Sequence, residues 1–407
     1  MANNNDKKVL NVPALRFPEF SGEWEKYVLT EFVERVTRRN KGNECKLPLT
    51  ISAQYGLVDQ ITFFNKIIAS DDMSNYYLLT NGDFAYNKSY SSEYPWGAIK
   101  RLDRYEYGAL SSLYICFRPL NHVSSDFLTH YFETKKWHQG ISEIAVEGAR
   151  NHGLLNIGIQ DFFATKHYLP QSILEQEKIA CFLNLIEERI RLQNKIIEKY
   201  ESLIQAIIYQ KKTDGIRKGN WQKTELSKVL QERTEKNING YTVCSVSVSQ
   251  GIINQIEYLG RSFAAKETSH YNVVKYGDIV YTKSPTGDFP YGIVKRSYIK
   301  NAVAVSPLYG VYKPIDDNIG VILHFYFMQP NNAFNYLHPL IQKGAKNTIN
   351  ITNTRFLENS IPLPKTEDEA VYIANALTRI QTKIDIEKSL LRSYEREKQY
   401  LLRQMFI

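Results

Sequence analysis

The stretch GDFAYNKS at residues 82–89 returns as GDIVYTKS at residues 277–284, and each copy is followed at the same distance by a related motif, PWGAIKR or PYGIVKR. From Ser52 to Pro119 the copies align at a constant offset of 195 residues without a gap, and weaker matches extend over nearly the whole chain. Internal similarity at a fixed spacing is the signature of a duplicated structural unit. The sequence therefore predicts two copies of one domain in a single chain.

Length and composition agree with this duplication. The 407 residues are enough for two or three domains, and 43% hydrophobic with 23% charged residues is typical of a globular protein. No apolar run reaches the ~20 residues of a membrane span, and the start MANNNDKKVL lacks the apolar stretch of a secretory signal, so we expect a cytoplasmic protein. The four cysteines show no C-x-x-C spacing, which argues against a disulfide framework or a thiolate metal site.

Each copy has a strand-rich part and a helical part, which together predict an α+β chain of four segments. Residues 1–169 and 213–363 contain short apolar or alternating runs between Gly, Pro, Asn and Asp, the pattern of strands joined by turns. We call these segments head 1 and head 2. Residues 170–212 and 364–407 are predicted as two long spacer helices, and both begin with a capping box, Ser172 with Glu175 and Thr366 with Glu369.

The spacer helices carry apolar residues at alternating steps of four and three, which is the pattern of a coiled-coil seam. The first seam is Ile179, Leu183, Ile186, Ile190, Gln193, Ile197, Tyr200 and Ile204, and the second is Ile373, Leu377, Ile380, Ile384, Glu387, Leu391 and Tyr394. Both copies place one polar residue and one tyrosine at matching steps. We expect an antiparallel pair about 60 Å long; the alternative is that each helix packs on its own head.

Two similar heads on a stiff spacer would be related by an approximate twofold, a symmetry that matches the strands of B-DNA, whose turn is about 34 Å long. The formal net charge of +8 agrees with a polyanionic partner. This interpretation makes double-stranded DNA the expected partner.

Comparing the copies separates two kinds of candidate DNA-binding residue. Residues retained in both copies suit sequence-independent phosphate contacts, although solvated surface charge would look the same: Lys88 and Lys283, Lys100 and Lys295, Arg101 and Arg296, Arg150 and Lys346, Asn151 and Asn347. Residues that differ within matched stretches are candidates for base reading, although loop drift is the alternative: Gln54 and Tyr55 against Ser249 and Gln250, Asn87 against Thr282, and Tyr90, Ser91 and Ser92 against Pro285, Thr286 and Gly287.

The sequence offers little for catalysis. It has no phosphate-binding loop, no H-x-x-x-H pair, and neither the glycine-rich turn nor the polar-Pro-Pro-aromatic motif of a nucleic-acid methyltransferase. We interpret Gly82-Asp83 and Gly277-Asp278 as turn residues rather than as catalytic groups. A nuclease or methylase acting alone is therefore disfavoured, whereas a noncatalytic coiled-coil adaptor with sequence-independent DNA affinity stays open as an alternative.

Four stretches of the sequence are informative when taken together: the opening VPALRFPEFSGEWEKYVLTEF, the motifs ISAQYGLVDQ and GDFAYNKSYSSEYPWGAIKRL, and the helix LPQSILEQEKIACFLNLIEERIRLQNK. In combination they resemble the specificity subunit of type I restriction-modification enzymes. The second spacer departs from this pattern, because it reads EDEAVYIANALTRI where the first reads EQEKIACFLNLI, and Lys398 interrupts its seam.

The resemblance implies that each head is a target recognition domain that reads one half of a bipartite asymmetric DNA site. It further implies that the helix pair sets the gap between the half-sites and docks two modification (methyltransferase) subunits, joined by ATP-dependent restriction subunits. This chain would be noncatalytic, with no catalytic residue, metal or cofactor of its own, and S-adenosylmethionine, ATP and Mg would bind the partner subunits. The departure in the second spacer puts equal docking of partners at both ends in doubt.

Overall fold

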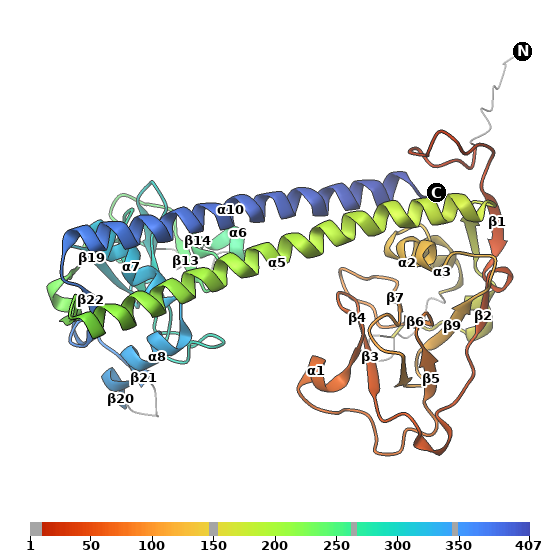
Figure 1. Cartoon of the computed structure of the whole chain (residues 1–407), viewed down its shortest axis with the longest axis horizontal. Helices are drawn as coiled ribbons and strands as arrows, with labels where there is room; N and C mark the ends of the chain where they lie inside the picture. The colour runs from red at the N-terminus through yellow and green to blue at the C-terminus, as the bar shows by residue number, and fades with distance from the viewer. Residues whose placement is uncertain (1–9, 146–153, 262–266, 344–348) are drawn as a thin grey trace, which may run out of the picture. The chain divides into compact units, whose positions relative to one another are not determined.

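The computed structural model describes residues 10–145, 154–261, 267–343 and 349–407, and it separates the chain into two compact units (Figure 1). Unit 1 comprises Met1–Leu192 and Leu391–Ile407, and unit 2 comprises Gln193–Leu390. Each unit thus combines one head with adjoining portions of both long helices, whereas the sequence suggested heads and spacers as separate segments.

Unit 1 contains ten short strands and four short helices in its head, among the residues described. The strands are β1 (Glu25–Val28), β2 (Val33–Arg35), β3 (Pro48–Ser52), β4 (Gly56–Asp59), β5 (Tyr77–Thr80), β6 (Phe84–Asn87), β7 (Ala98–Arg101), β8 (Tyr107–Leu110), β9 (Ile115–Pro119) and β10 (Lys166–Leu169). The helices are α1 (Gln60–Phe64), α2 (Ser125–Glu133), α3 (His138–Ile144) and α4 (Ile159–Phe163). The strands form one antiparallel sheet in the order β2-β9-β6-β7, a second sheet in the order β4-β3-β8-β5, and the pair β1-β10.

The head of unit 2 repeats the first four-stranded sheet and the separate strand pair of unit 1. Its strands are β11 (Trp221–Glu225), β12 (Leu230–Glu232), β13 (Cys244–Ser247), β14 (Gly251–Asn254), β15 (Asn272–Val274), β16 (Ile279–Tyr281), β17 (Val294–Arg296), β18 (Val303–Val305), β19 (Gly310–Pro314), β20 (Gln342–Lys343), β21 (Ile349–Asn350) and β22 (Ser360–Pro364). Its helices are α6 (Gln255–Leu259), α7 (Asp317–Phe327), α8 (Pro330–Leu337) and α9 (Asn353–Phe356). The sheet β12-β19-β16-β17 and the pair β11-β22 match β2-β9-β6-β7 and β1-β10 of unit 1. The α+β fold with an internal repeat is confirmed.

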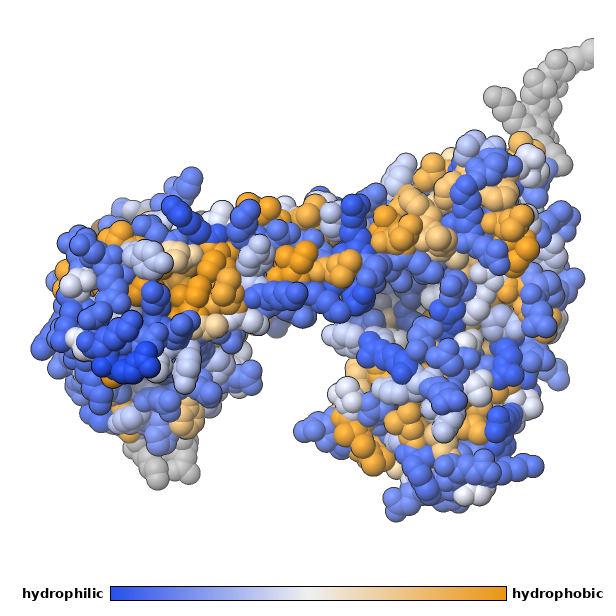
Figure 2. All heavy atoms as spheres, viewed as in Figure 1, coloured by the Kyte–Doolittle hydropathy of each residue, from blue (hydrophilic) through white to orange (hydrophobic). Residues whose placement is uncertain are grey.

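Hydrophilic side chains cover most of the visible surface of each unit, with apolar patches between them (Figure 2). Among the described residues, no helix combines the length and apolarity needed to cross a membrane.

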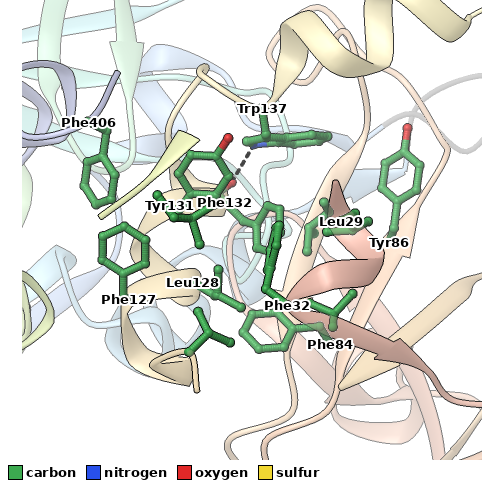
Figure 3. Close-up of a cluster of buried hydrophobic side chains, with 14 of the residues drawn as sticks. Leu29, Phe32, Phe84, Tyr86, Phe127, Leu128, Tyr131, Phe132, Trp137 and Phe406 are labelled. Atoms are coloured by element: carbon green, nitrogen blue, oxygen red, sulfur yellow. Dashed lines mark hydrogen bonds between the residues drawn. The ribbon is translucent and has the colours of Figure 1, made fainter. Parts of the chain in front are cut away.

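An aromatic core fixes the head of unit 1 to the helix ends (Figure 3). Phe127 and Tyr131 of α2 lie against Phe406, which follows the C-terminal helix, at ring-centroid distances of 5.3 and 6.1 Å. Trp137 donates a hydrogen bond from its indole nitrogen to the carbonyl of Phe132 at 3.0 Å. Because buried aromatic rings bring large apolar areas out of water, this cluster makes the last turn of the chain part of the head's core.

The two long helices, α5 (Ile173–Lys218) and α10 (Glu367–Gln404), run antiparallel within each unit. In unit 1, Glu187 pairs with Lys398 at 2.6 Å, and in unit 2, Glu201 pairs with Lys388 at 2.7 Å. All fifteen predicted seam residues are buried or half-buried. Lys398 breaks the apolar pattern without leaving a buried charge unpaired, because it reaches Glu187.

The polar step of the seam forms a cross-helix contact. The side-chain amide of Gln193 donates to the carboxylate of Glu387 at 2.5 Å and to its backbone carbonyl at 3.1 Å. These two residues occupy the same position of the repeat, so α5 and α10 meet at equivalent residues. A buried polar contact of this kind selects one register of a coiled coil at some cost in stability.

The first long helix extends six residues beyond its predicted end at 212 and contains Gly215. A Cβ atom at Gly215 would lie 2.0 Å from the ring of Trp221, so only glycine lets the indole pack on the helix. The same indole donates to Glu369 at 3.0 Å, as Trp24 of unit 1 donates to Glu175 at 3.2 Å. The retained Trp residues thus tie each head to the first turn of a long helix.

Candidate nucleic-acid interface

The clearest pair of candidate base-reading sites is the tip of the hairpin β3–β4 in head 1 and of β13–β14 in head 2. Both turns have the same frame: the hydroxyl of Ser52 accepts from the amide of Tyr55, and that of Ser247 accepts from the amide of Gln250. The following glycines, Gly56 and Gly251, have φ near +75°, at +78° and +72°. The frame is therefore shared by the two heads.

The side chains on this shared frame differ and face solvent. Gln54 and Tyr55 are exposed in head 1, with Tyr55 58% exposed, and Ser249 and Gln250 are exposed in head 2. The structure therefore places these four predicted residues where a ligand can reach them.

Tyr55 continues into an exposed apolar surface on α1, which is visible in Figure 2. Its ring lies 6.4 Å from that of Phe63, which in turn lies 4.7 Å from that of Phe64. The cap of α1 is firm, because Asp59 accepts from the amide of Thr62 at 2.9 Å. The pKa of Asp59 is lowered, chiefly by this hydrogen bond to Thr62, so its carboxylate stays ionised as a cap.

A second candidate region is the loop from β6 to β7 in head 1 and from β16 to β17 in head 2. Both loops close through a glycine, because a Cβ at Gly97 would lie 2.1 Å from the carbonyl oxygen of Asn87, and one at Gly292 would lie 1.8 Å from that of Thr282. Tyr86 and Tyr281 hold the loops alike, each donating from its hydroxyl to a loop carbonyl at 2.8 Å.

The predicted base readers in this loop differ in accessibility. Ser91, Ser92 and Thr286 are exposed, and Tyr90 and Asn87 are half-buried. Thr282 is only 2% exposed, and its hydroxyl accepts from the amide of Ile293 at 3.3 Å. The geometry therefore disfavours base contact by Thr282, and the role of the others stays a prediction.

The predicted phosphate contacts Lys100 and Arg101 are held by acids of their own head. Lys100 pairs with Glu133, and Arg101 lies 2.6 Å from both Asp103 and Asp126. These pairs join β7 to both ends of α2, so the structure accounts for the two cations as internal clamps.

Their counterparts in head 2 are buried more deeply. Arg296 is 1% exposed, pairs with Asp317 at 2.5 Å, and lies between the rings of Tyr276 and Tyr298 at 4.8 and 4.7 Å. Lys295 is 3% exposed, and burial lowers its pKa to about 8. Neither side chain is accessible to a phosphate in this conformation.

The remaining phosphate candidates divide into two groups. Lys88 and Lys283 are half-buried, and burial lowers the pKa of Lys283. Arg150, Asn151, Lys346 and Asn347 lie outside the described residues.

Asp83 and Asp278 are structural, as interpreted from the sequence. Each is fully buried and receives a two-pronged hydrogen bond from an arginine: Arg118 binds Asp83 at 2.7 and 3.0 Å, and Arg233 binds Asp278 at 2.6 and 2.9 Å. The two arginines come from different strands, Arg118 from β9 and Arg233 from the residue after β12. Neither aspartate is available for catalysis.

Among the residues described, no group of three or more His, Cys, Asp or Glu side chains is arranged to hold a metal ion. The sequence comparison also missed one feature, a basic segment at residues 35–41 with Arg35, Arg38, Arg39 and Lys41. Comparison of the copies did not select it, because only Arg39 has a cation, Lys236, at the matching position of head 2. The local density of cations would have revealed the segment.

No protein-family model matches the sequence. The structure is similar to the S subunit of the type I restriction-modification system from M. genitalium, with a TM-score of 0.57 and 12% identity over 97% of this chain and 99% of that one. It is also similar to a chain solved in work on complex assembly and conformational transition of the type I R-M system, with a TM-score of 0.50 and 15% identity over 94% and 97% of the two chains. The chain therefore has, along nearly its full length, the fold of a type I restriction-modification S subunit.

Proposed function

We propose that this chain is the DNA sequence-recognition subunit of a type I restriction-modification complex. The observation that carries the proposal is the combination of the S-subunit fold with two heads that share hairpin frames and differ at the exposed tips. A shared frame would dock both heads on DNA in the same way, and different tip side chains would give them different bases to contact. Each head then reads one half of a bipartite asymmetric site.

In this proposal the antiparallel pair α5 and α10 sets the gap between the half-sites and docks two modification subunits. The Gln193–Glu387 contact supports a fixed gap, because slipping the helices past each other would bury both polar groups without partners. The chain itself is noncatalytic. S-adenosylmethionine, ATP and Mg bind the modification and restriction subunits.

The test is to sequence methylated DNA from a host that carries this chain with its cognate modification subunit. In one variant the tip residues 53–55 (AQY) are replaced by 248–250 (VSQ), and the matched control carries the reciprocal replacement in head 2. We expect an asymmetric two-part adenine motif whose first half changes or is lost in the first variant and whose second half changes in the control. Identical methylation in all three strains would remove the tips from base reading. Absent methylation from a stable complex would refute the recognition function.

A further inference from the structure

The basic segment 35–41 differs from Lys100 and Arg101 in having no acid partner among the described residues of its own unit. Arg35, Arg38 and Lys41 are exposed and Arg39 is half-exposed. Across the described part of unit 1, no carboxylate lies within ion-pair distance of any of the four, whereas Arg16, Lys100, Arg101 and Arg118 all have one. Four cations in seven residues without counter-charges form a local positive patch.

The backbone under this patch is rigid, because it bonds to both sheets of head 1. The amide of Val36 donates to Cys116 of β9, and Arg38 and Asn40 bond to the chain at the start of β5, each at 2.9 Å. Asn40 is fully buried, and its side chain bonds to both backbone groups of Cys45 at 2.8 and 3.0 Å. The cations thus project from a fixed edge rather than from a loose loop.

The ring of Tyr77 organises two of the side chains. The guanidinium of Arg39 lies 4.3 Å from its centroid, and Arg35 reaches its hydroxyl at 3.5 Å. Arg39 also donates to the carbonyl of Asn75 at 2.5 Å. Guanidinium groups stacked in this way keep free donors for a second acceptor, which suits phosphate oxygens.

Head 2 has the same backbone without the net positive charge, because the four matching positions are occupied by Glu232, Glu235, Lys236 and Ile238. Asn237 takes the place of Asn40, with its amide bonded to Tyr271 as that of Asn40 is bonded to Tyr76. Glu232 and Glu235 therefore stand where head 1 has Arg35 and Arg38. These glutamates are used internally: Glu235 pairs with Lys275 at 2.8 Å, and Glu232 accepts from Asn353 at 2.8 Å. The two heads therefore share the scaffold of this edge, whereas its four positions carry four cations in head 1 and two acids with one lysine in head 2.

We propose that Arg35, Arg38, Arg39 and Lys41 form a phosphate-binding patch by which head 1, and not the equivalent edge of head 2, grips the backbone of duplex DNA. This inference rests on the proposed DNA-recognition function and deepens it. Its consequence is an unequal division of labour: head 1 supplies a larger share of sequence-independent affinity, whereas both heads read bases.

The experiment measures binding of the full-length chain, in complex with its modification subunit, to a labelled random-sequence duplex from 50 to 300 mM KCl. The variant R35Q/R38Q/K41Q leaves the stacked Arg39 in place. The matched control R104Q/K135Q/K136Q removes three exposed cations from another part of head 1, away from α5 and α10. Each phosphate contact contributes about 0.9 to the slope of log K against log salt, so two or three lost contacts lower the slope by about 1.8 to 2.7. If the variant and the parent bind equally at 1 M salt, this difference in slope makes the variant bind about 60- to 500-fold more weakly than the parent at 0.1 M salt.

The outcomes separate this inference from the function on which it rests. A lower slope in the patch variant alone, with an unchanged methylated motif, supports the patch. The parent can bind duplex DNA and direct methylation of a two-part motif while the patch variant shows an unchanged slope. That result overturns the proposal of a phosphate-binding patch and leaves the recognition function standing. Intact DNA binding with loss of the modification subunit also overturns it, because the patch would then be a protein contact. A parent that binds no duplex and directs no methylation overturns both.

Discussion

Lys295 and Lys100 stand at the same position of the repeat in opposite electrostatic settings, and replacing each by methionine tests the account of both. Lys100 has Glu133 as its partner, whereas no carboxylate among the described residues of unit 2 lies within ion-pair distance of Lys295. Lys295 is only 3% exposed, so the desolvation of its charged amine is not offset by an ion pair and lowers the stability of head 2. We therefore expect Lys295→Met to stabilise head 2 and Lys100→Met to leave head 1 unchanged or weaker by up to about 1 kcal/mol.

The size of the effect follows from the lowered pKa of Lys295, about 8 against the usual 10.5. Each pKa unit corresponds to about 1.4 kcal/mol, so the difference amounts to about 3 kcal/mol. Because the folded state binds the proton more weakly, the full penalty is present below pH 8. It falls as the pH rises from about 8 to 10.5 and is gone above that range. The gain from Lys295→Met is therefore about 2 to 3 kcal/mol at pH 7, and that electrostatic part disappears above pH 10.5.

Scanning calorimetry of the full chain at several pH values measures the gain, and hydrogen exchange of β16 and β17 assigns it to head 2. A Lys295→Met variant that is less stable at pH 7 would refute the reasoning. So would a gain of the same size at pH 7 and pH 10.5, since it would come from packing alone.

Three further predictions concern the contacts that hold the heads and helices. Gly215→Ala forces a Cβ against Trp221 and should cost about 1 to 3 kcal/mol in thermal unfolding, despite the better helix propensity of alanine; an increase in stability would contradict the packing of the indole. Asp278→Ala removes the carboxylate that binds Arg233 and should destabilise head 2 by about 3 kcal/mol or more, seen as faster hydrogen exchange in β16; unchanged exchange would argue against a structural role. Gln193→Leu should leave the carboxylate of Glu387 without its donor and lower the melting temperature in thermal unfolding; an unchanged melting temperature would argue against the cross-helix contact.

Local patterns in the sequence predicted the helices and their seam, because the four-three spacing depends only on neighbouring residues. The equivalence of Gln193 and Glu387 was also visible, but their contact depends on where two antiparallel helices cross. The retained cations were assigned to phosphate because their acid partners lie far away in the sequence and cannot be recognised from it. Arg101 meets Asp126 and Arg296 meets Asp317 only after folding brings strand and helix together.

The same limit applies to the candidate base readers. Asn87 and Thr282 align in the repeat, yet the threonine hydroxyl faces inward to the amide of Ile293, which pairwise comparison of letters cannot detect. The hairpin tips were easier, because a short turn between two strands has little room to bury its side chains. The basic segment was missed because selection by retention between copies discards a cluster of cations that one head has and the other lacks.

The buried Asp83 and Asp278 are bound by arginines from different strands, and this difference restricts how segments can be exchanged between the heads. The strand registers align Arg118 with Lys313 and Val36 with Arg233. A recombinant that takes β2 from head 1 and the counterpart of β9 from head 2 would have no arginine for the buried aspartate. The reverse recombinant would have two arginines for the one carboxylate. Viable chimeras must therefore carry β2 and β9 from the same parent, which makes the segment from β2 to β9, rather than the single strand, the smallest unit that can be exchanged between the heads.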